Sequence, residues 1–163
     1  MFKTDNYKNK TVVITGGTKG IGLGITKAYL SLSAKVIILA RNKPKKQIQV
    51  KGNKALFYQW NVRDNANVEE VINEVFKANK CIDVLINNAG GAPLINSLDA
   101  SINFNNAIID LNLNSSFTVS YYVAKKMIKK SSGCVITNIS SVTATRPTPG
   151  SFGYVITHRK WRV

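Results

Sequence analysis

Five short runs of apolar and β-branched residues predict five buried strands. Polar stretches or segments with helical spacing separate them, so strand and helix signals alternate along the chain. Such alternation predicts a parallel sheet with helices on both faces, the doubly wound α/β class. The predicted strands cover residues 11–15, 35–40, 55–60, 84–87 and 134–139.

Three segments have helical spacing: 21–32, 67–78 and a longer one from about 102 to 130. In the second, apolar side chains recur every three or four positions. In the third, five residues lie near one stripe: Leu113, Phe117, Tyr121, Ala124 and Ile128. Residues 41–54 leave room for only a short helix, interrupted early by Pro44.

The size of the chain predicts one domain, residues 1–163, because 163 residues with 44% hydrophobic content form one sizeable core and no linker is visible. A polar N-terminus and short apolar runs argue against a membrane segment, and we expect a cytoplasmic protein. Cys81 and Cys134 are far apart, which supports neither a disulfide framework nor a zinc site.

The net charge of +15 is high, and it is unevenly spread. Residues 41–54 contain several Lys and Arg but no acid, and no acid follows Asp110. This balance would suit a basic nucleic-acid-binding protein. We favour a solvated lysine-rich surface, because the basic residues are not interleaved with an aromatic platform or with a nucleic-acid motif.

A glycine-rich corner follows the first predicted strand and opens the first predicted helix. Gly16 allows a tight turn, Gly20 lets backbone N–H groups approach a ligand, and Gly22 lets the helix pack closely on the strand. Alone, this corner fits an ordinary strand-to-helix connection as well as a phosphate cradle. The stretch Thr15-Gly16-Gly17-Thr18-Lys19-Gly20-Ile21-Gly22 resembles the opening of the short-chain dehydrogenase/reductase family.

Further segments extend this resemblance over nearly the whole chain. Asn61 and Val62 follow the third strand, where the family has an Asp-Val pair beside adenine, and the turn Asn87-Asn88-Ala89-Gly90 looks like the family's turn beside the cofactor. Backbone preferences for turns would explain either segment taken singly. Asn112 resembles the family's mid-helix Asn that organises a proton relay, although a capping or kinking role is equally compatible with it.

Ser141 and Tyr154 have the spacing of the family's catalytic pair. By that resemblance, Ser141 would hold the substrate oxygen and Tyr154 would exchange its proton while a hydride passes to or from the nicotinamide. Taken singly, both residues could be structural.

His158 departs from the family, which has Lys four residues after the Tyr. That Lys lowers the phenol pKa and binds the nicotinamide ribose, whereas a His is mostly neutral at pH 7 and reaches less far. Residues 155–163 form an atypical tail, and we expect a shortened chain in which the gene was interrupted after Tyr154.

The resemblance implies a Rossmann-type doubly wound parallel sheet in three α/β/α layers, here lacking the usual C-terminal strands and leaving one sheet edge unpaired. It implies a carbonyl/alcohol oxidoreductase that binds a dinucleotide through Gly16, Thr18, Lys19, Gly20, Ile21, Gly22, Arg41, Asn61, Val62, Asn88, Ala89 and Gly90.

Arg41 directly follows the second strand, where a base would accept the 2′-phosphate of NADP, and Lys19 adds a second cation. We therefore expect NADP in preference to NAD, a small-molecule substrate, and impaired turnover. A dinucleotide-binding remnant without activity is the main alternative. Pairing of two copies through the long helix near Tyr121 is a further expectation from the family.

Overall fold

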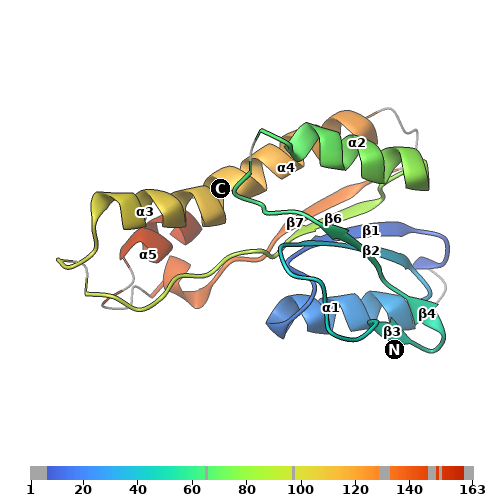
Figure 1. Cartoon of the computed structure of the whole chain (residues 1–163), viewed down its shortest axis with the longest axis horizontal. Coiled ribbons are helices and arrows are strands. Elements are labelled where there is room, and N and C mark those ends of the chain that lie inside the picture. Colours follow the sequence, from blue (N-terminus) through green and yellow to red (C-terminus); the bar gives the residue numbers. More distant parts are fainter. Residues whose placement is uncertain are drawn as a thin grey trace.

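A computed structural model describes residues 7–64, 66–96, 98–128, 133–146, 150 and 152–159 of the chain. Its main sheet has five parallel strands in the order β5-β2-β1-β6-β7 (Figure 1). The strands are β1 (Thr11–Thr15), β2 (Lys35–Ala40), β5 (Leu56–Gln59), β6 (Val84–Asn87) and β7 (Val135–Asn138). All five predicted strands are confirmed to within one residue at each end.

Helices cover both faces of this sheet, which confirms the three-layer doubly wound class (Figure 1). One face carries α1 (Gly20–Ser31), and the other carries α2 (Val68–Asn79) and α4 (Ser115–Met127). Beyond the sheet, α3 (Ile102–Ile109) packs against α5 (Phe152–Arg159) and lies away from α1.

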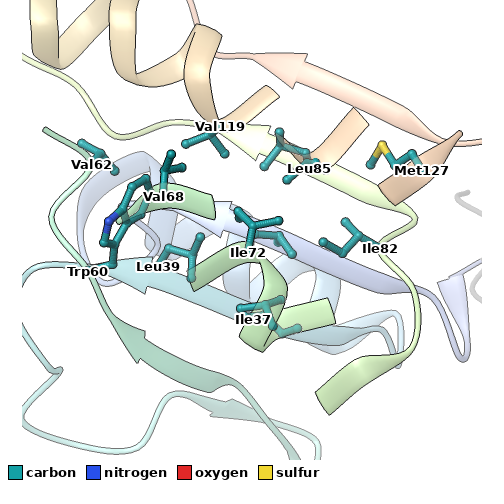
Figure 2. Packing of buried hydrophobic residues seen from close by; sticks show 13 residues of the cluster. Ile37, Leu39, Trp60, Val62, Val68, Ile72, Ile82, Leu85, Val119 and Met127 are labelled. Carbon is teal, nitrogen blue, oxygen red and sulfur yellow. The ribbon is translucent and has the colours of Figure 1, made fainter. Parts of the chain in front are cut away.

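Two apolar clusters form the core, one on each side of the sheet. On the α1 side, Leu30 packs with inward residues of the strands such as Val12 and Ile38. On the other side, Trp60 packs against Val68 at the start of α2, within the cluster drawn in Figure 2. The central strands β1 and β2 are buried on both faces, as expected of a parallel sheet covered by helices.

The prediction of a short helix within residues 41–54 is wrong. This segment instead forms a small antiparallel hairpin of β3 (Gln49–Val50) and β4 (Asn53–Lys54). Lys51 and Gly52 both have positive φ, 48° and 82°, as a two-residue hairpin turn with the right-handed twist of its strands requires. The hairpin is held to α1 because the Asn53 side-chain amide donates to the Leu30 carbonyl at 3.0 Å.

The long predicted helix exists, but a π-helical turn, η2 (Asp110–Asn114), separates α3 from α4. The apolar stripe that we singled out in it turns outward, with Phe117, Tyr121 and Ile128 exposed. The core face of α4 is instead Val119, Val123 and Met127. Pairing of two copies through α4 remains a prediction.

β7 lies at one end of the sheet order, and Val135 is 55% exposed there. Within the described residues no strand pairs with its outer edge. None of the helices in this part of the chain has the length and apolar character needed to cross a bilayer.

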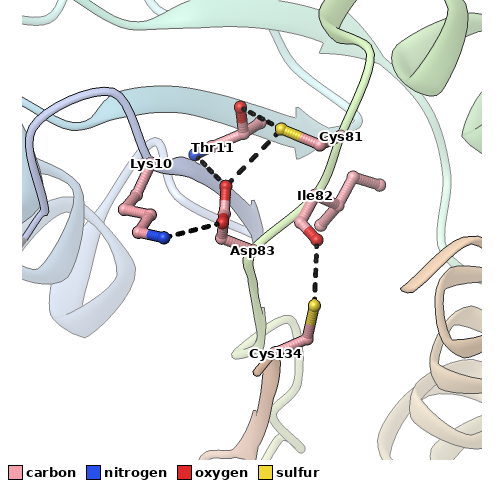
Figure 3. A network of polar contacts seen from close by, with 6 residues as sticks. All are labelled: Lys10, Thr11, Cys81, Ile82, Asp83 and Cys134. Atoms are coloured by element: carbon pink, nitrogen blue, oxygen red, sulfur yellow. Dashed lines mark hydrogen bonds and ion pairs between the residues drawn. The ribbon is translucent and has the colours of Figure 1, made fainter. Parts of the chain in front are cut away.

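A buried carboxylate joins the amino ends of the central strands (Figure 3). Asp83 precedes β6 and is 4% exposed. One carboxylate oxygen accepts the Thr11 backbone N–H at 2.8 Å, and the other lies 3.4 Å from the Lys10 ammonium. Cys81 also donates to this carboxylate through its Sγ, at 3.6 Å. The network fixes the sheet at the edge opposite the carboxyl ends of the strands.

Replacing Asp83 by Asn is expected to lower the free energy of unfolding by about 1–3 kcal/mol, because the charged acceptor is lost from a buried network. Urea unfolding monitored by circular dichroism measures the change. The matched variant Lys10→Met removes only the half-exposed partner and should cost less than about 1 kcal/mol. An unchanged midpoint for Asp83→Asn would contradict this assignment.

Candidate dinucleotide site

A cavity of about 570 Å³ lies at the carboxyl ends of the strands. Its lining follows the strand order, from Trp60 and Val62 after β5 to Asn138 and Ser140 around the end of β7. Neighbouring strands lie about 4.8 Å apart, so the cavity spans roughly 20 Å across five strands. This length suits two nucleotides joined end to end, and the volume lies within the range of small-molecule sites.

The glycine corner forms the middle of this lining. Gly20 has φ +54°, and a Cβ there would meet nothing within 4 Å. Gly22 is the opposite case, because a Cβ would overlap the Asn88 side-chain amide and the Gly16 carbonyl oxygen. Gly20 thus leaves space beside the backbone, while Gly22 is required for close packing of helix on strand.

The amino end of α1 offers unused hydrogen-bond donors toward this space. Lys19 at the N-cap makes no side-chain capping bond, and the first turn contains no acidic residue. Free N–H groups and the helix dipole favour an anion at such an end. Lys19 and Arg41 also line the cavity, whose described lining includes no carboxylate. The corner therefore fits a pyrophosphate.

The turn after β6 is hydrogen-bonded directly to this glycine corner. The backbone N–H groups of Asn88 and Ala89 both donate to Thr15 Oγ1 at 3.0 Å. The Asn88 side-chain amide donates to the carbonyl oxygens of Thr15, at 3.0 Å, and Gly16, at 3.2 Å. Asn88, Ala89 and Gly90 all line the cavity.

Asn112 is buried in the π-helical turn and positions the next part of the lining. Its side chain donates to the Ile108 carbonyl at 2.9 Å and exchanges two hydrogen bonds with the Gly91 backbone. Because the side chain occupies a carbonyl of the helical ladder, the turn widens there. Gly90 must be small, since a Cβ would lie 2.7 Å from Asn112 Oδ1.

Tyr154 and His158 are brought together on α5, and both line the cavity. Their rings lie with centroids 4.0 Å apart, tilted by 39°. His158 is 6% exposed, and burial lowers its pKa from the usual 6.5, so the imidazole is neutral at pH 7. The fixed positive charge that a lysine would supply beside Tyr154 is therefore missing.

Two predicted residues do not reach the lining. Ser141 Oγ accepts from the Thr143 backbone N–H at 3.3 Å and from the Thr143 hydroxyl at 3.0 Å, although its neighbour Ser140 does line the cavity. Asn61 Oδ1 accepts from the Arg63 backbone N–H at 3.2 Å, as in an ordinary turn. The roles of both residues in the site stay predictions.

Sequence reasoning missed other residues of the lining, among them Trp60 and Asn87. The Asn87 amide donates to Ser120 Oγ and to Asn138 Oδ1, both at 2.8 Å, and so joins β6 to α4 and β7. Their positions in the sequence could have identified them, because both residues lie at the carboxyl end of a predicted strand.

The sequence of the chain was compared with those of known protein families. The family pattern described as short chain dehydrogenase matches residues 10–157. The chain belongs to this family. Its members are oxidoreductases that use NAD or NADP, and the resemblance stated from the motifs is confirmed.

Two curated relatives illustrate the match. The 3-oxoacyl-[acyl-carrier-protein] reductase FabG of Chlamydia muridarum is 32% identical over 152 residues, covering 90% of this chain and 61% of the relative. Oxidoreductase UcpA of Salmonella typhimurium is also 32% identical over 152 residues, covering 90% of this chain and 57% of the relative. The chain thus spans about three fifths of the length of these relatives.

Solved structures show the same fold. The ligand-free aldohexose dehydrogenase of Thermoplasma acidophilum superposes with a TM-score of 0.88 at 29% identity, over 96% of this chain and 59% of that one. A short chain dehydrogenase of Leptospira borgpetersenii with bound NAD⁺ superposes with a TM-score of 0.89 at 27% identity, over 98% of this chain and 64% of that one.

Gly22→Ala is expected to destabilise the fold by about 1–3 kcal/mol, because the added methyl group forces the corner apart. Gly24→Ala is the matched control on the same helix, where a Cβ would meet nothing within 4 Å. It should be neutral or stabilise the fold by up to about 1 kcal/mol through helix propensity. Thermal unfolding compares the two, and equal effects would refute the packing argument.

The lowered pKa of His158 predicts a contribution to acid sensitivity. Between its folded value and 6.5, the unfolded chain binds the proton and the folded chain does not, so stability falls as pH falls through this window. Unfolding midpoints at pH 7.5 and pH 5 should therefore differ more for the wild type than for His158→Gln. A larger difference for the variant would show the opposite sign.

Proposed function

We propose that the chain binds NADP(H) across this cavity and interconverts a carbonyl and an alcohol, with turnover slowed by His158. The observation that carries the proposal is the continuous lining from Arg41, through the glycine corner and the Asn88 turn, to Tyr154. These groups would hold, in order, a ribose phosphate, a pyrophosphate and a nicotinamide beside a reacting oxygen.

The preference for NADP rests on charge. Arg41 directly follows β2 and is exposed on the lining together with Lys19. A guanidinium pairs well with the dianionic 2′-phosphate that distinguishes NADP from NAD, whereas a carboxylate at this place would favour the ribose hydroxyls of NAD.

A bound nicotinamide would supply or accept the hydride. Tyr154 would give the proton to the substrate oxygen, or take it, and Ser141 would donate its O–H to the same oxygen. Asn112 would hold the Gly91 backbone and the π-helical turn in place behind the nicotinamide. The names of the relatives include a 3-oxoacyl reductase, an aldohexose dehydrogenase and a 3alpha-hydroxysteroid dehydrogenase, which fits a small carbonyl or alcohol substrate.

A second candidate is dinucleotide binding without turnover. Two observations favour it: His158 is neutral, and Ser141 lies off the lining with its oxygen engaged by Thr143. A neutral neighbour supplies no fixed positive charge to favour loss of the Tyr154 phenol proton during proton transfer near neutral pH.

Arg41→Ala should weaken NADPH binding about fivefold to tenfold and leave NADH binding nearly unchanged, because it removes one charged contact to the 2′-phosphate. Titration calorimetry at fixed salt measures both affinities. Lys43→Ala is the matched control, since Lys43 is exposed on the same segment but does not line the cavity. Equal losses for the two cofactors, or for the two variants, would contradict the assignment.

Turnover is tested by NADPH oxidation over a panel of aldehydes and ketones. His158→Lys should raise kcat about tenfold at pH 7.5, because a fixed positive charge beside the phenol favours its ionised form during proton transfer. Tyr154→Phe should abolish the activity of both backgrounds. NADPH binding with no turnover in either the wild type or His158→Lys would select the second candidate.

A further inference from the structure

Trp60 carries a hydrogen-bond donor that no group in the described part of the chain uses. The residue is buried, with 5% of its surface exposed, and none of the described residues accepts from its Nε1–H. A buried donor without a partner costs free energy, and the N–H of a buried tryptophan usually has one. An acceptor supplied by a ligand would therefore be stabilised at this position.

The backbone holds Trp60 at the edge of the cavity. Its backbone N–H donates to the Ala40 carbonyl oxygen at 3.0 Å, which continues the pairing of β5 with β2 beyond the end of β5. Trp60 thus lies beside the residue that precedes Arg41, and both Trp60 and Arg41 line the cavity. Figure 2 shows the indole nitrogen on the edge of the ring turned away from Leu39 and Val68, two apolar members of the same cluster. The donor is therefore directed away from the core.

The strand order indicates which part of a dinucleotide this donor would meet. β5 is the last strand of the sheet order, and β2, which Arg41 follows, lies between β5 and β1, which the glycine corner follows. With a pyrophosphate at the corner and a ribose phosphate at Arg41, the group beyond Arg41 is the base. Adenine presents ring nitrogens, N1, N3 and N7, that accept hydrogen bonds, whereas an indole N–H can only donate.

We infer that Trp60 donates its Nε1–H to a ring nitrogen of the adenine and is thus a base-binding residue of this chain. The inference rests on the proposed function, because it requires the adenosine end of a dinucleotide beside Arg41. It assigns the contact to a residue other than Asn61, which stands at the family's adenine position. Asn61 Oδ1 accepts from the Arg63 backbone N–H, and Asn61 does not line the cavity.

The test follows the indole N–H signal of the ¹⁵N-labelled chain during addition of NADPH and of its adenosine half, 2′,5′-ADP. The chain has two tryptophans, so Trp161→Phe leaves the Trp60 signal alone. Both ligands should move this signal downfield. Of the 1-deaza, 3-deaza and 7-deaza derivatives of 2′,5′-ADP, one should fail to move it and should bind about fivefold more weakly, because it lacks the accepting nitrogen.

An indole signal that stays in place with either ligand, while the amide signals of Gly16–Gly22 respond to NADPH, would overturn the inference. Equal shifts and equal affinities for all three derivatives would also overturn it, since a ribose or phosphate oxygen would then be the acceptor. This comparison needs no change at Trp60 itself. Failure of the wild type to bind NADPH and NAD⁺ at millimolar concentration would instead overturn the proposed function.

Trp60→Phe gives an independent measurement, because it keeps an aromatic ring and removes the donor. It should bind 2′,5′-ADP about fivefold more weakly than the wild type and should bind the selected deaza derivative no more weakly than 2′,5′-ADP. Tyr58→Phe is the matched control, since Tyr58 lies on β5, is half-buried and does not line the cavity. It should bind like the wild type, and equal affinities of the wild type and Trp60→Phe would contradict the inference.

Discussion

The site depends on one group of hydrogen bonds, here called the clip, between the carboxyl ends of the neighbouring parallel strands β1 and β6. The hydroxyl of Thr15, the last residue of β1, accepts two backbone N–H groups from the turn after β6, and the Asn88 side chain donates to the carbonyl oxygens of Thr15 and Gly16. This clip sets where the glycine corner opens and where the Asn88 turn begins. Gly22 has no Cβ because the Asn88 amide occupies that space. The floor of the cavity is therefore fixed by hydrogen bonds between these two side chains and the backbone.

At the other end of the cavity, residue 158 is subject to two opposing requirements. Proton transfer by Tyr154 benefits from a nearby positive charge, whereas burial against the tyrosine ring favours a neutral side chain. In this chain burial prevails, since desolvation is the largest cause of the lowered His158 pKa. The packing that buries the imidazole, 6% exposed beside the Tyr154 ring, thus also removes its charge.

Much of the fold follows from short-range patterns. The run 36–40 is apolar at every position, as is typical of a strand buried on both faces, and the glycine spacing marks the first corner. The hairpin at residues 49–54 was missed because its strands are two residues long and its turn, Lys51-Gly52, is identified by backbone angles that apolar periodicity does not record. The Phe117 stripe was wrongly assigned to the core because α4 carries two apolar stripes, and the one formed by Val119, Val123 and Met127 is the one that faces the sheet.

The candidate site was only partly predictable for a different reason. Motifs located the glycine corner, the Asn88 turn and Tyr154, because each has a characteristic spacing. Trp60 and Asn87 belong to the lining through strand order, which brings together residues far apart in sequence. The orientation of the His158 ring depends on a contact of 3.0 Å between Nδ1 and the Tyr154 carbonyl oxygen, and no sequence pattern contains that distance.

Amide chemical shifts of the ¹⁵N-labelled protein, followed during addition of NADPH, test the central claim most directly. The account predicts the largest changes at Gly16–Gly22, Asn88–Gly91 and around Tyr154, with little change at Lys10, Cys81 and Asp83 on the opposite edge of the sheet. Changes confined to the lysine-rich surface of residues 43–54, or no changes at millimolar NADPH, would contradict it.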